Sequence, residues 1–309
     1  MKAARVLRFG PPEVIVLQDL PVPSPGAGEL LVRVEAAGVG PWDALLREGK
    51  SALAQTLPLT LGSDIAGRVE AVGAGVSGFH AGEEVFGVTN EQFTGAYAEY
   101  ALAAAGKMAA RPSGLSFLEA ASMPVVAVTA WQMLFEYGHA AAGQTVLIHG
   151  GAGNVGAYAV QMAKNAGLEV FATAASSDLQ YVQSLGAHRV LDYRKEHFDQ
   201  ALRDIDLVLD TVGGETREKS VNVLRPGGIL VSVVSPPVSG QTPQGITALF
   251  FYADVTTERL NNIIRLFQSG ELRTHVGTVL PLEQVQVAHR MLGGLAHAPG
   301  KIVLQIARD

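Results

Sequence analysis

Three glycines at fixed spacing are the residues of this chain with the clearest chemical use. Gly151, Gly153 and Gly156 match the pattern G-x-G-x-x-G. In such a turn the first glycine permits a tight bend, the second lets the backbone approach a pyrophosphate, and the third lets a helix pack closely on a strand. Asn154 and Val155 lie in the same turn, where free N–H groups and the helix dipole attract phosphate. These five residues are therefore candidate ligands of a dinucleotide.

The segments on either side of the glycines predict a strand and a helix. Residues 145–148 are β-branched or aliphatic, as in a strand that is buried on both faces. After the turn, apolar residues recur at helical spacing up to Gly167, which is expected to end the helix. A second strand is predicted at 168–173. Glycine is common in this chain, so the motif alone is weak, but its position between strand and helix favours a dinucleotide turn over an ordinary glycine turn.

The end of the second strand bears on the choice between NAD and NADP. An NAD site usually has Asp or Glu there, which binds the ribose 2′-hydroxyl and repels a 2′-phosphate. Residues 173–177 contain no carboxylate, and Ser176 and Ser177 offer hydroxyl donors. Asp178 is better explained as the first residue of a helix. We therefore expect the cofactor to be NADPH.

Length and composition exclude several classes of protein. A chain of 309 residues with 48% hydrophobic and 17% charged residues predicts a compact protein of about two domains. The net charge of −6, with no lysine or arginine cluster, argues against nucleic acid or an anionic membrane as partner. No apolar run is long enough for a membrane span, and no signal-peptide pattern is present. The absence of cysteine excludes disulfides and thiolate zinc sites, and we expect a cytoplasmic protein.

Strand and turn patterns divide the chain into two predicted domains. Residues 1–123 contain short strands and turns rich in Gly and Pro, whereas strands and helices alternate over 124–267, which predicts an α/β doubly wound parallel sheet. The last strand, at 302–306, needs partners, so 268–309 is expected to return to the first domain. The strands are predicted at 3–9, 14–19, 29–37, 65–72 and 84–88 in the first domain, and at 145–148, 168–173, 189–191, 207–210 and 229–234 in the second.

Motifs along nearly the whole chain resemble the medium-chain dehydrogenase/reductase superfamily, in particular its zinc-independent quinone oxidoreductase (zeta-crystallin-like) branch. The matching segments are 38–43 (GVGPWD), the glycine-rich pattern of 58–87, 97–100 (YAEY), 128–131 (VTAW), the glycine turn, 224–228 (LRPGG) and 300–303 (GKIV). The resemblance implies a GroES-like β-barrel catalytic domain, made of 1–123 and 268–309, and a Rossmann nucleotide-binding domain at 124–267.

The chain also departs from this superfamily at positions that carry chemistry. Gly40 stands where the family usually has Asn, so an amide that often reaches cofactor or substrate is missing. Ser63 and Asp64 replace the His-Glu pair of the zinc-dependent alcohol dehydrogenases, and the histidines show no metal-ligand spacing. We therefore expect no metal.

The resemblance implies three more cofactor-binding residues, each with an ordinary alternative. Thr129 matches a threonine near the nicotinamide, or it caps the start of a helix. Tyr193 matches a tyrosine near the adenosine phosphate, or it is a half-buried aromatic at a strand end. Phe250, with its neighbours, lies where relatives close over the nicotinamide, or it belongs to the core.

Other polar residues are expected to have structural roles. His149 is expected to be satisfied by backbone groups and not to donate a proton. Lys301 is expected to be a solvated residue before an edge strand. Asp43 and Asp64 form no evident acid/base pair, and neither is assigned a catalytic role. The acceptor would be chosen by residues 40–46, 64, 129–133 and 249–252.

The resemblance implies an NADPH-dependent reductase that transfers hydride, without a metal, to quinones or α,β-unsaturated carbonyl compounds. One alternative is an enoyl-thioester reductase of lipid or polyketide metabolism. Another is a crystallin-like cofactor-binding protein with little turnover, of a kind that includes RNA binders, although the acidic composition counts against RNA. We expect a homodimer, because the aliphatic strand at 229–234 is a poor candidate for an edge that is exposed to solvent.

Overall fold

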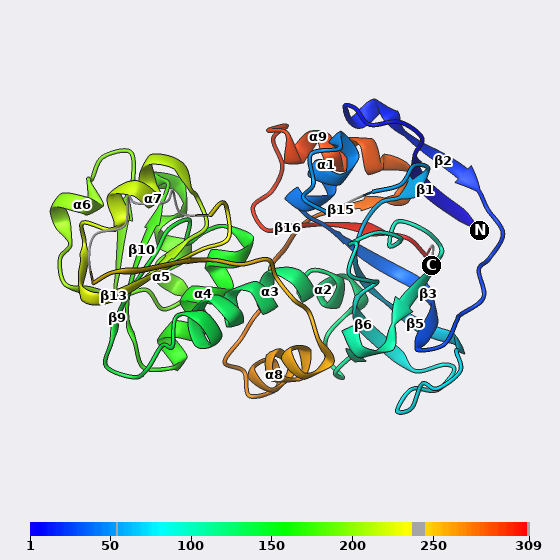
Figure 1. Cartoon of the computed structure of the whole chain (residues 1–309), viewed down its shortest axis with the longest axis horizontal. Helices are drawn as coiled ribbons and strands as arrows, with labels where there is room; N and C mark the ends of the chain where they lie inside the picture. Colours follow the sequence, from blue (N-terminus) through cyan, green and yellow to red (C-terminus); the bar gives the residue numbers. More distant parts are fainter. Residues whose placement is uncertain (54, 237–244, 308–309) are drawn as a thin grey trace. The chain divides into compact units, whose positions relative to one another are not determined.

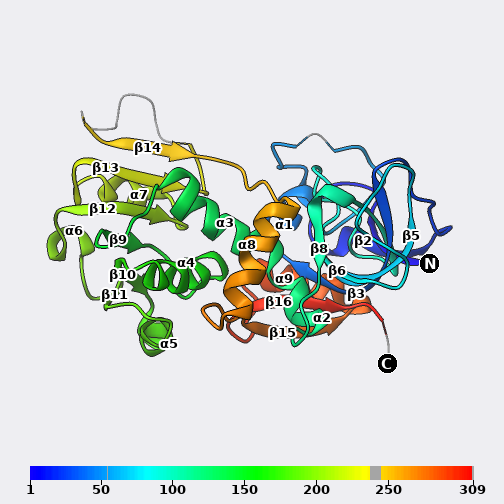
Figure 2. The same cartoon turned by 90° about the horizontal axis from the view of Figure 1, so that it is seen from below.

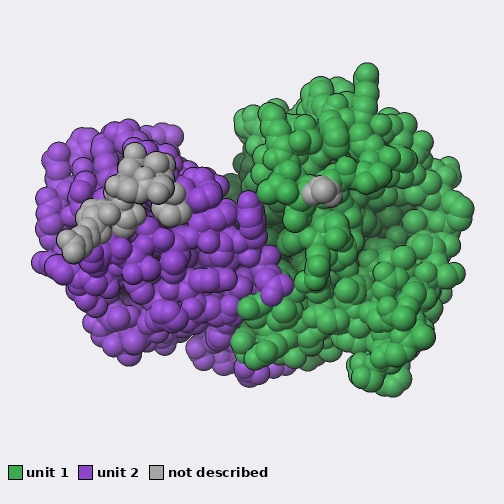
Figure 3. All heavy atoms as spheres, in the orientation of Figure 1, with its two compact units in different colours: residues 1–125, 255–264, 274–309 green, residues 126–254, 265–273 purple. Residues whose placement is uncertain are grey.

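The computed structural model of the chain describes residues 1–53, 55–236 and 245–307 (Figure 1). The chain forms two compact units, coloured separately in Figure 3. Unit 1 comprises Met1–Val125, Val255–Ile264 and Thr274–Asp309, and unit 2 comprises Val126–Asp254 and Arg265–Arg273. The segment 255–264, which the sequence pattern had grouped with the second domain, thus belongs to unit 1.

Unit 1 is built mainly from antiparallel strands. One sheet has the order β2-β1-β4, and a larger one has the order β15-β16-β3-β5-β6-β8, with β7 also paired to β3. The strands are β1 (Lys2–Val6), β2 (Ile15–Asp19), β3 (Glu29–Val39), β4 (Leu59–Thr60), β5 (Asp64–Val72), β6 (Glu84–Val88), β7 (Tyr100–Ala104), β8 (Met108–Ala110), β15 (Val276–Pro281) and β16 (Lys301–Gln305). The helices are α1 (Pro41–Glu48), α2 (Phe117–Ala121) and α9 (Val285–Leu292), together with the start of α8 (Thr257–Gln268).

The central strand of unit 1, β3, is buried along most of its length. Leu30, Val32 and Val34 of β3 are all buried in one hydrophobic cluster of this unit. The C-terminal strand β16 pairs antiparallel with β3, Ile302 opposite Val39, and parallel with β15. This confirms the expectation that the last strand returns to the sheet of the first domain.

Unit 2 is a six-stranded sheet in which all neighbouring strands run parallel, in the order β11-β10-β9-β12-β13-β14. The strands are β9 (Thr145–Ile148), β10 (Glu169–Ala174), β11 (Arg189–Asp192), β12 (Ile205–Asp210), β13 (Leu224–Ser232) and β14 (Thr247–Phe250). The helices are α3 (Pro124–Trp131), α4 (Asn154–Asn165), α5 (Leu179–Ser184), α6 (Phe198–Ala201) and α7 (Gly214–Ser220), with a π-helical turn at Gln132–Tyr137 after α3.

The strand order reverses between β9 and β12, which makes the sheet doubly wound. The chain moves outward from β9 through α4 to β10 and through α5 to β11, then returns to β12 on the other side of β9. Right-handed crossovers in opposite directions place α4 and α5 on one face and α7 on the other. Ligands of such sheets bind beyond the carboxyl ends of the strands at this switch point. The predicted α/β fold with a Rossmann sheet is therefore confirmed.

The prediction that strand 229–234 is the edge of this sheet is wrong. β14 lies beyond β13, with Ile229 opposite Thr247 and Val231 opposite Leu249, as Figure 2 shows. β14 was missed because four residues with mixed burial give no clear strand pattern. The aliphatic character of β13 is explained by its position between two strands of its own chain.

Across the part of the chain that the structure describes, every helix is too short or too polar to cross a bilayer.

Candidate functional site

The glycine turn follows β9 at the switch point of the unit 2 sheet. Gly156 has no room for a side chain, because an added Cβ would lie 2.1 Å from the carbonyl oxygen of Gly150. The close approach of α4 to the turn therefore depends on the third glycine of the motif. The left-handed backbone of the turn belongs to Gly150, with φ +72°, and not to Gly151. Gly150 was not predicted as a residue of the turn, although it directly precedes the motif.

Helix α4 begins at the end of this turn with an N-terminus that carries no side-chain cap. Gly153 is its N-cap residue and makes no side-chain hydrogen bond. An added Cβ at Gly153 would meet only the Gly150 oxygen, at 3.2 Å, so the outer side of the turn is open. Asn154 and Val155 open the helix and are half-buried. The first N–H groups of this 12-residue helix are therefore available to an anion.

His149 precedes the turn and is hydrogen-bonded to side chains on both sides of its ring. Its Nδ1 lies 3.1 Å from Thr173 Oγ1 and its Nε2 lies 3.0 Å from Ser220 Oγ. Thr173 Oγ1 in turn accepts a hydrogen bond of 3.3 Å from the backbone N–H of Gly150. Burial lowers the pKa of His149 to about 4, so the ring is neutral. The expectation that backbone groups satisfy His149 is wrong in its partners, because two side-chain hydroxyls do so.

The two serines at the end of β10 are both hydrogen-bonded to carboxylates. Ser176 donates to Asp192, and Ser177 donates to Asp178 Oδ1 at 3.1 Å. Asp192 reaches Ser176 because the parallel register places it opposite Ala174. The segment 173–177 lacks a carboxylate, as noted from the sequence, but the next strand supplies one. Asp192 could have been found from the register of the strands predicted at 168–173 and 189–191, because they pair as parallel neighbours.

Asp192 is itself surrounded by donors. It accepts from the backbone N–H of Arg194 at 3.0 Å and forms an ion pair with Lys195 at 3.3 Å. The hydrogen bond from Ser176 is the main reason that the pKa of Asp192 is lowered. Tyr193 is 56% exposed, with the Arg194 guanidinium 5.6 Å from its ring centre. The carboxyl end of β11 therefore presents an exposed phenol and two cations.

Thr129 and Phe250, the two residues that the resemblance implies for the nicotinamide, also lie in unit 2. Thr129 is buried well inside α3, so the explanation of Thr129 as a helix-start cap is wrong. Phe250 ends β14, half-buried, and its ring contacts that of Tyr252 edge-on at 5.0 Å. Phe251 beside it is buried and stacks on Tyr137 at 4.3 Å, so it belongs to the core.

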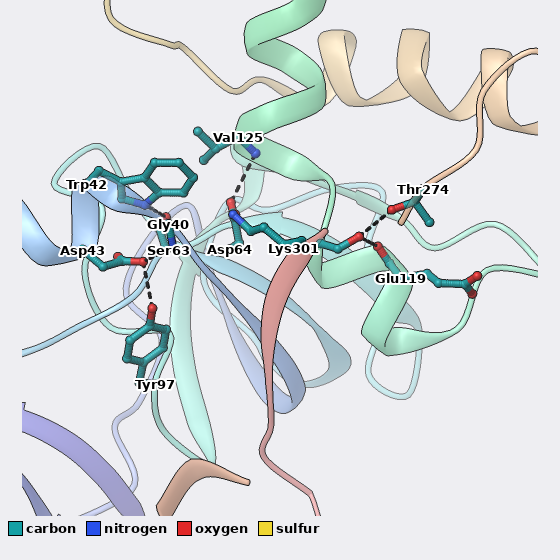
Figure 4. Close-up of polar contacts among 11 residues, drawn as sticks. Gly40, Trp42, Asp43, Ser63, Asp64, Tyr97, Glu119, Val125, Thr274 and Lys301 are labelled. Atoms are coloured by element: carbon teal, nitrogen blue, oxygen red, sulfur yellow. Dashed lines mark hydrogen bonds and ion pairs between the residues drawn. The ribbon is translucent and has the colours of Figure 1, made fainter. Parts of the chain in front are cut away.

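Unit 1 contains a buried ion pair that the sequence did not predict. Lys301 Nζ lies 3.1 Å from Asp64 Oδ2, and the side chains are 2% and 0% exposed (Figure 4). Asp64 Oδ1 also accepts a hydrogen bond of 3.2 Å from the backbone N–H of Val125. Burial raises the pKa of Asp64, and the Lys301 charge opposes that rise. The expectation that Lys301 is a solvated residue is wrong, because strand β16 begins at this lysine and carries it into the sheet.

A second buried carboxyl lies in the same unit, near the start of α1. Asp43 Oδ2 accepts from the N–H of Gly40 at 2.8 Å and from the hydroxyl of Tyr97 at 2.7 Å. Its Oδ1 is buried and has no hydrogen-bond partner among the described residues. Burial raises the pKa of Asp43 to about 7. Carboxyls with a pKa raised by burial are typical of functional sites, although structural networks produce them too.

Trp42 joins these two carboxyl sites. Its Nε1 donates to Ser63 Oγ at 3.1 Å, and the Lys301 ammonium lies 4.4 Å from its ring centre (Figure 4). Cation–π contacts of this kind stabilise both partners. Within residues 1–53, 55–236 and 245–307, no three His, Cys, Asp or Glu side chains gather as a metal ion would require.

Two conserved domain patterns match the chain. Residues 26–113 match the alcohol dehydrogenase GroES-like domain, and residues 185–304 match the zinc-binding dehydrogenase domain. A quinone oxidoreductase of Pongo abelii is 33% identical over 323 residues, which cover 98% of this chain and 97% of the relative. The chain belongs to the quinone oxidoreductases of the medium-chain dehydrogenase/reductase superfamily.

The chain is also similar to a methylene-furanone reductase and to a solved structure that contains NADPH. The 2-methylene-furan-3-one reductase of Solanum lycopersicum is 36% identical over 251 residues, covering 77% of this chain and 64% of the relative. A mycobacterial structure in complex with NADPH superimposes with a TM-score of 0.89 and 29% identity, and the match covers 99% of this chain and all of that one. The fold and the superfamily together indicate a nicotinamide cofactor.

Proposed function

We propose that the protein is an NADPH-dependent reductase that transfers hydride to quinones or α,β-unsaturated carbonyl compounds without a metal. The observation that carries the proposal is the turn from Gly150 to Gly156, which opens an uncapped helix N-terminus at the switch point of the unit 2 sheet. The named activities of the relatives, toward quinones and a methylene-furanone, narrow the class of acceptor.

The residues of unit 2 fit a bound dinucleotide. The N–H groups of Asn154, Val155 and Gly156 would bind the pyrophosphate, and the open side of Gly153 lets the phosphates approach. Ser177, Tyr193 and Arg194 would bind the 2′-phosphate. Because Ser176 already donates to Asp192, its part would be to hold that carboxylate in place. Thr129 and Phe250 would adjoin the nicotinamide, which supplies the hydride when bound.

The acceptor chemistry needs little more from the protein than orientation and a dry site. A conjugated carbonyl draws charge away from the carbon that accepts hydride, so the negative charge develops on oxygen. The protein must hold the acceptor against the nicotinamide and exclude bulk water, and hydrogen bonds must stabilise that oxygen. Water supplies the proton afterwards. The proposed chemistry needs no metal, and the chain has no cysteine and has Ser63 and Asp64 in place of the His-Glu pair of the zinc-dependent enzymes.

The test is a panel of acceptors with the purified protein. Loss of reduced nicotinamide is followed with NADPH against quinones, enones, enals and crotonyl thioesters, and zinc is measured by elemental analysis. We expect turnover with quinones or enones, in protein that contains no stoichiometric zinc. Turnover of the thioester alone would favour the lipid or polyketide alternative. An absence of oxidation with every acceptor, or a requirement for one zinc per chain, would contradict the proposal.

We also propose that the protein is a homodimer joined at the edge of the unit 2 sheet. β14 pairs with β13 on one side, and no strand in the described residues pairs with its other side. An unpaired edge is a template for a strand of a second copy. A mass measurement by light scattering at micromolar concentration should give the dimer, and a monomer would refute this.

A further inference from the structure

Unit 1 contains a cavity of about 460 Å³ that is lined by residues of this unit alone. Its walls come from the start of β1, the middle of β3, the chain around the start of β7, the turn at Leu282–Gln284 and the two residues that follow β16. None of the residues proposed above for the cofactor or the acceptor is among them. Small-molecule sites have volumes of roughly 300–1,000 Å³, so the cavity has room for a small organic ligand.

The floor of the cavity is apolar. Val34, Leu282 and Ile306 line it, and they are only 1%, 5% and 8% exposed. All three belong to a hydrophobic core cluster of unit 1. Because the core holds these side chains in place, an apolar ligand that covers them leaves water without disturbing the protein.

Three hydrogen-bond donors lie on the rim, namely the ammonium group of Lys2, the guanidinium group of Arg33 and the hydroxyl group of Tyr100. Arg33 is opposite Tyr100 in the antiparallel pair of β3 and β7, which places the two side chains on the same face. Arg33 pairs with Glu35 at 3.5 Å. Over the residues that the structure describes, the Lys2 ammonium has no ion-pair partner and the Tyr100 hydroxyl has no hydrogen bond. These donors are therefore available to an anionic group.

Two carboxylates, those of Glu99 and Glu283, lie on the same rim. Glu99 Oε2 accepts a hydrogen bond of 2.8 Å from the backbone N–H of Lys2, and the backbone N–H of Glu99 donates to the Lys2 carbonyl at 3.0 Å. The Glu283 carboxylate follows Leu282 of the floor and is exposed. The lining thus has two cationic and two anionic side chains. A ligand with one charge is attracted by one pair and repelled by the other.

Backbone hydrogen bonds join the segments that form the walls. The N–H of Val34 donates to the carbonyl of Glu99 at 2.9 Å, and the N–H of Ile306 donates to the carbonyl of Glu35 at 2.9 Å. Segments that are far apart in the sequence are therefore held in one frame before any ligand arrives. Such preorganisation lowers the entropy that is lost on binding.

We propose that this cavity binds a small zwitterion with an apolar body, of the class of the aromatic amino acids. Lys2, Arg33 and Tyr100 bind its carboxylate, the rim carboxylates bind its ammonium group, and the apolar body lies on the floor. Charge-assisted hydrogen bonds at both ends of the ligand give the site its selectivity. The inference goes beyond the proposed function and does not depend on it.

The experiment is calorimetric titration of the purified full chain with three ligands that share one body. L-phenylalanine has both charged groups, 3-phenylpropanoate has the carboxylate alone, and 2-phenylethylamine has the ammonium group alone. We expect L-phenylalanine to bind at least about tenfold more tightly than either of the others, because each of these lacks one set of contacts and meets like charges.

Two variants assign the ends of the ligand to the rim. Arg33→Gln should weaken L-phenylalanine and 3-phenylpropanoate about three- to tenfold but not 2-phenylethylamine. Glu99→Gln keeps an acceptor for the Lys2 N–H, and it should weaken L-phenylalanine and 2-phenylethylamine but not 3-phenylpropanoate. Arg290→Gln is the matched control, because Arg290 is 46% exposed against 49% for Arg33, and it pairs with Glu13 outside the cavity. It should leave all three affinities unchanged.

Three results would overturn the inference. They are an absence of L-phenylalanine binding up to about 10 mM, equal affinity for the three ligands, and L-phenylalanine binding that neither Arg33→Gln nor Glu99→Gln changes. General damage to the fold would weaken all three ligands together, which differs from the expected charge-specific pattern. The acceptor panel described above is measured separately, so a failure of the proposed function would leave these results unaffected.

Discussion

Lys301 and Asp64 form an ion pair, 3.1 Å from Nζ to Oδ2, from which solvent is almost completely excluded. The two residues are far apart in the sequence, and pairing of β16 with β3 brings the lysine to the start of β5. The lysine also lies against the ring of Trp42. One buried charge pair thus holds the start of β16, the start of β5 and the ring of Trp42 together.

Lys301→Met should destabilise the protein by about 3–5 kcal/mol at neutral pH, because Asp64 is left buried without its partner. Asp64 can relieve part of this cost by taking up a proton, so the loss should be smaller at acidic pH. Denaturant unfolding at pH 5 and pH 8 measures both effects. The double variant Asp64→Asn/Lys301→Met should be more stable than the sum of the single changes predicts. If the two effects simply add, the pair does not couple as described.

Asp43 should make the protein less stable as the pH rises. Burial raises its pKa from 3.8 to about 7, so between these values the folded state binds more protons than the unfolded chain. The free energy of unfolding must therefore fall with increasing pH in this window. Asp43→Asn keeps an acceptor for Gly40 and Tyr97 but cannot ionise. Its stability relative to the unsubstituted protein should increase from pH 4 to pH 8, and a constant difference would contradict the raised pKa.

Two glycines of the turn should respond differently to alanine. Gly156→Ala forces a Cβ against the Gly150 carbonyl and should destabilise the fold by about 1–3 kcal/mol. At Gly153 the added Cβ meets one atom at 3.2 Å, so Gly153→Ala should remain nearly as stable, while the affinity for NADPH falls about tenfold because the methyl group obstructs the phosphates. Thermal unfolding and cofactor titration separate the two. Equal effects on stability would show that the turn has been misinterpreted.

Arg194→Ala should weaken NADPH binding about tenfold and leave NADH binding nearly unchanged, because a charge-assisted hydrogen bond to the 2′-phosphate contributes roughly 1.5–3 kcal/mol. Arg189→Ala is the matched control, since Arg189 is at the other end of β11 and pairs with Glu196 at 3.0 Å. Titration with both cofactors measures the ratio. If the unsubstituted protein binds NADH as tightly as NADPH, the proposal of NADPH specificity is wrong.

Periodic patterns predicted three strands of unit 2 closely, but they did not predict β14, the strand at the edge of its sheet. β9 was predicted with its observed bounds, and β10 and β11 within one residue, because buried parallel strands have continuous apolar sequences. Gly167, with φ +79°, follows the end of α4 as expected. The strands that were missed are β14 and, in unit 1, β4, β7, β8 and β15, whereas β6 was predicted with its observed bounds. Most of the missed strands are short or only partly buried, so they show no clear period. Pairing across the sheet, which the sequence does not display, stabilises them.

The candidate site was predictable where one local segment contains it. The glycine turn is such a segment, and its residues lie together in the structure. The partnership of Ser176 with Asp192 depends on strand register, and the burial of Lys301 depends on a strand that returns from the end of the chain. Strand pairing between distant segments therefore determines the partners of Ser176 and Lys301, which are carboxylates and, for Lys301, also an aromatic ring.

The position of β16 also bears on synthesis by the ribosome. Residues 301–305 lie between β3 and β15 in the larger sheet of unit 1. Translation runs from the N-terminus, so all of unit 2 emerges before this strand does. Until that strand is made, the larger sheet of the first 125 residues lacks β15 and β16, and Asp64 lacks the ammonium group of Lys301. Chaperones that recognise unpaired strand edges would therefore act on the earliest part of the nascent chain, and for the longest time.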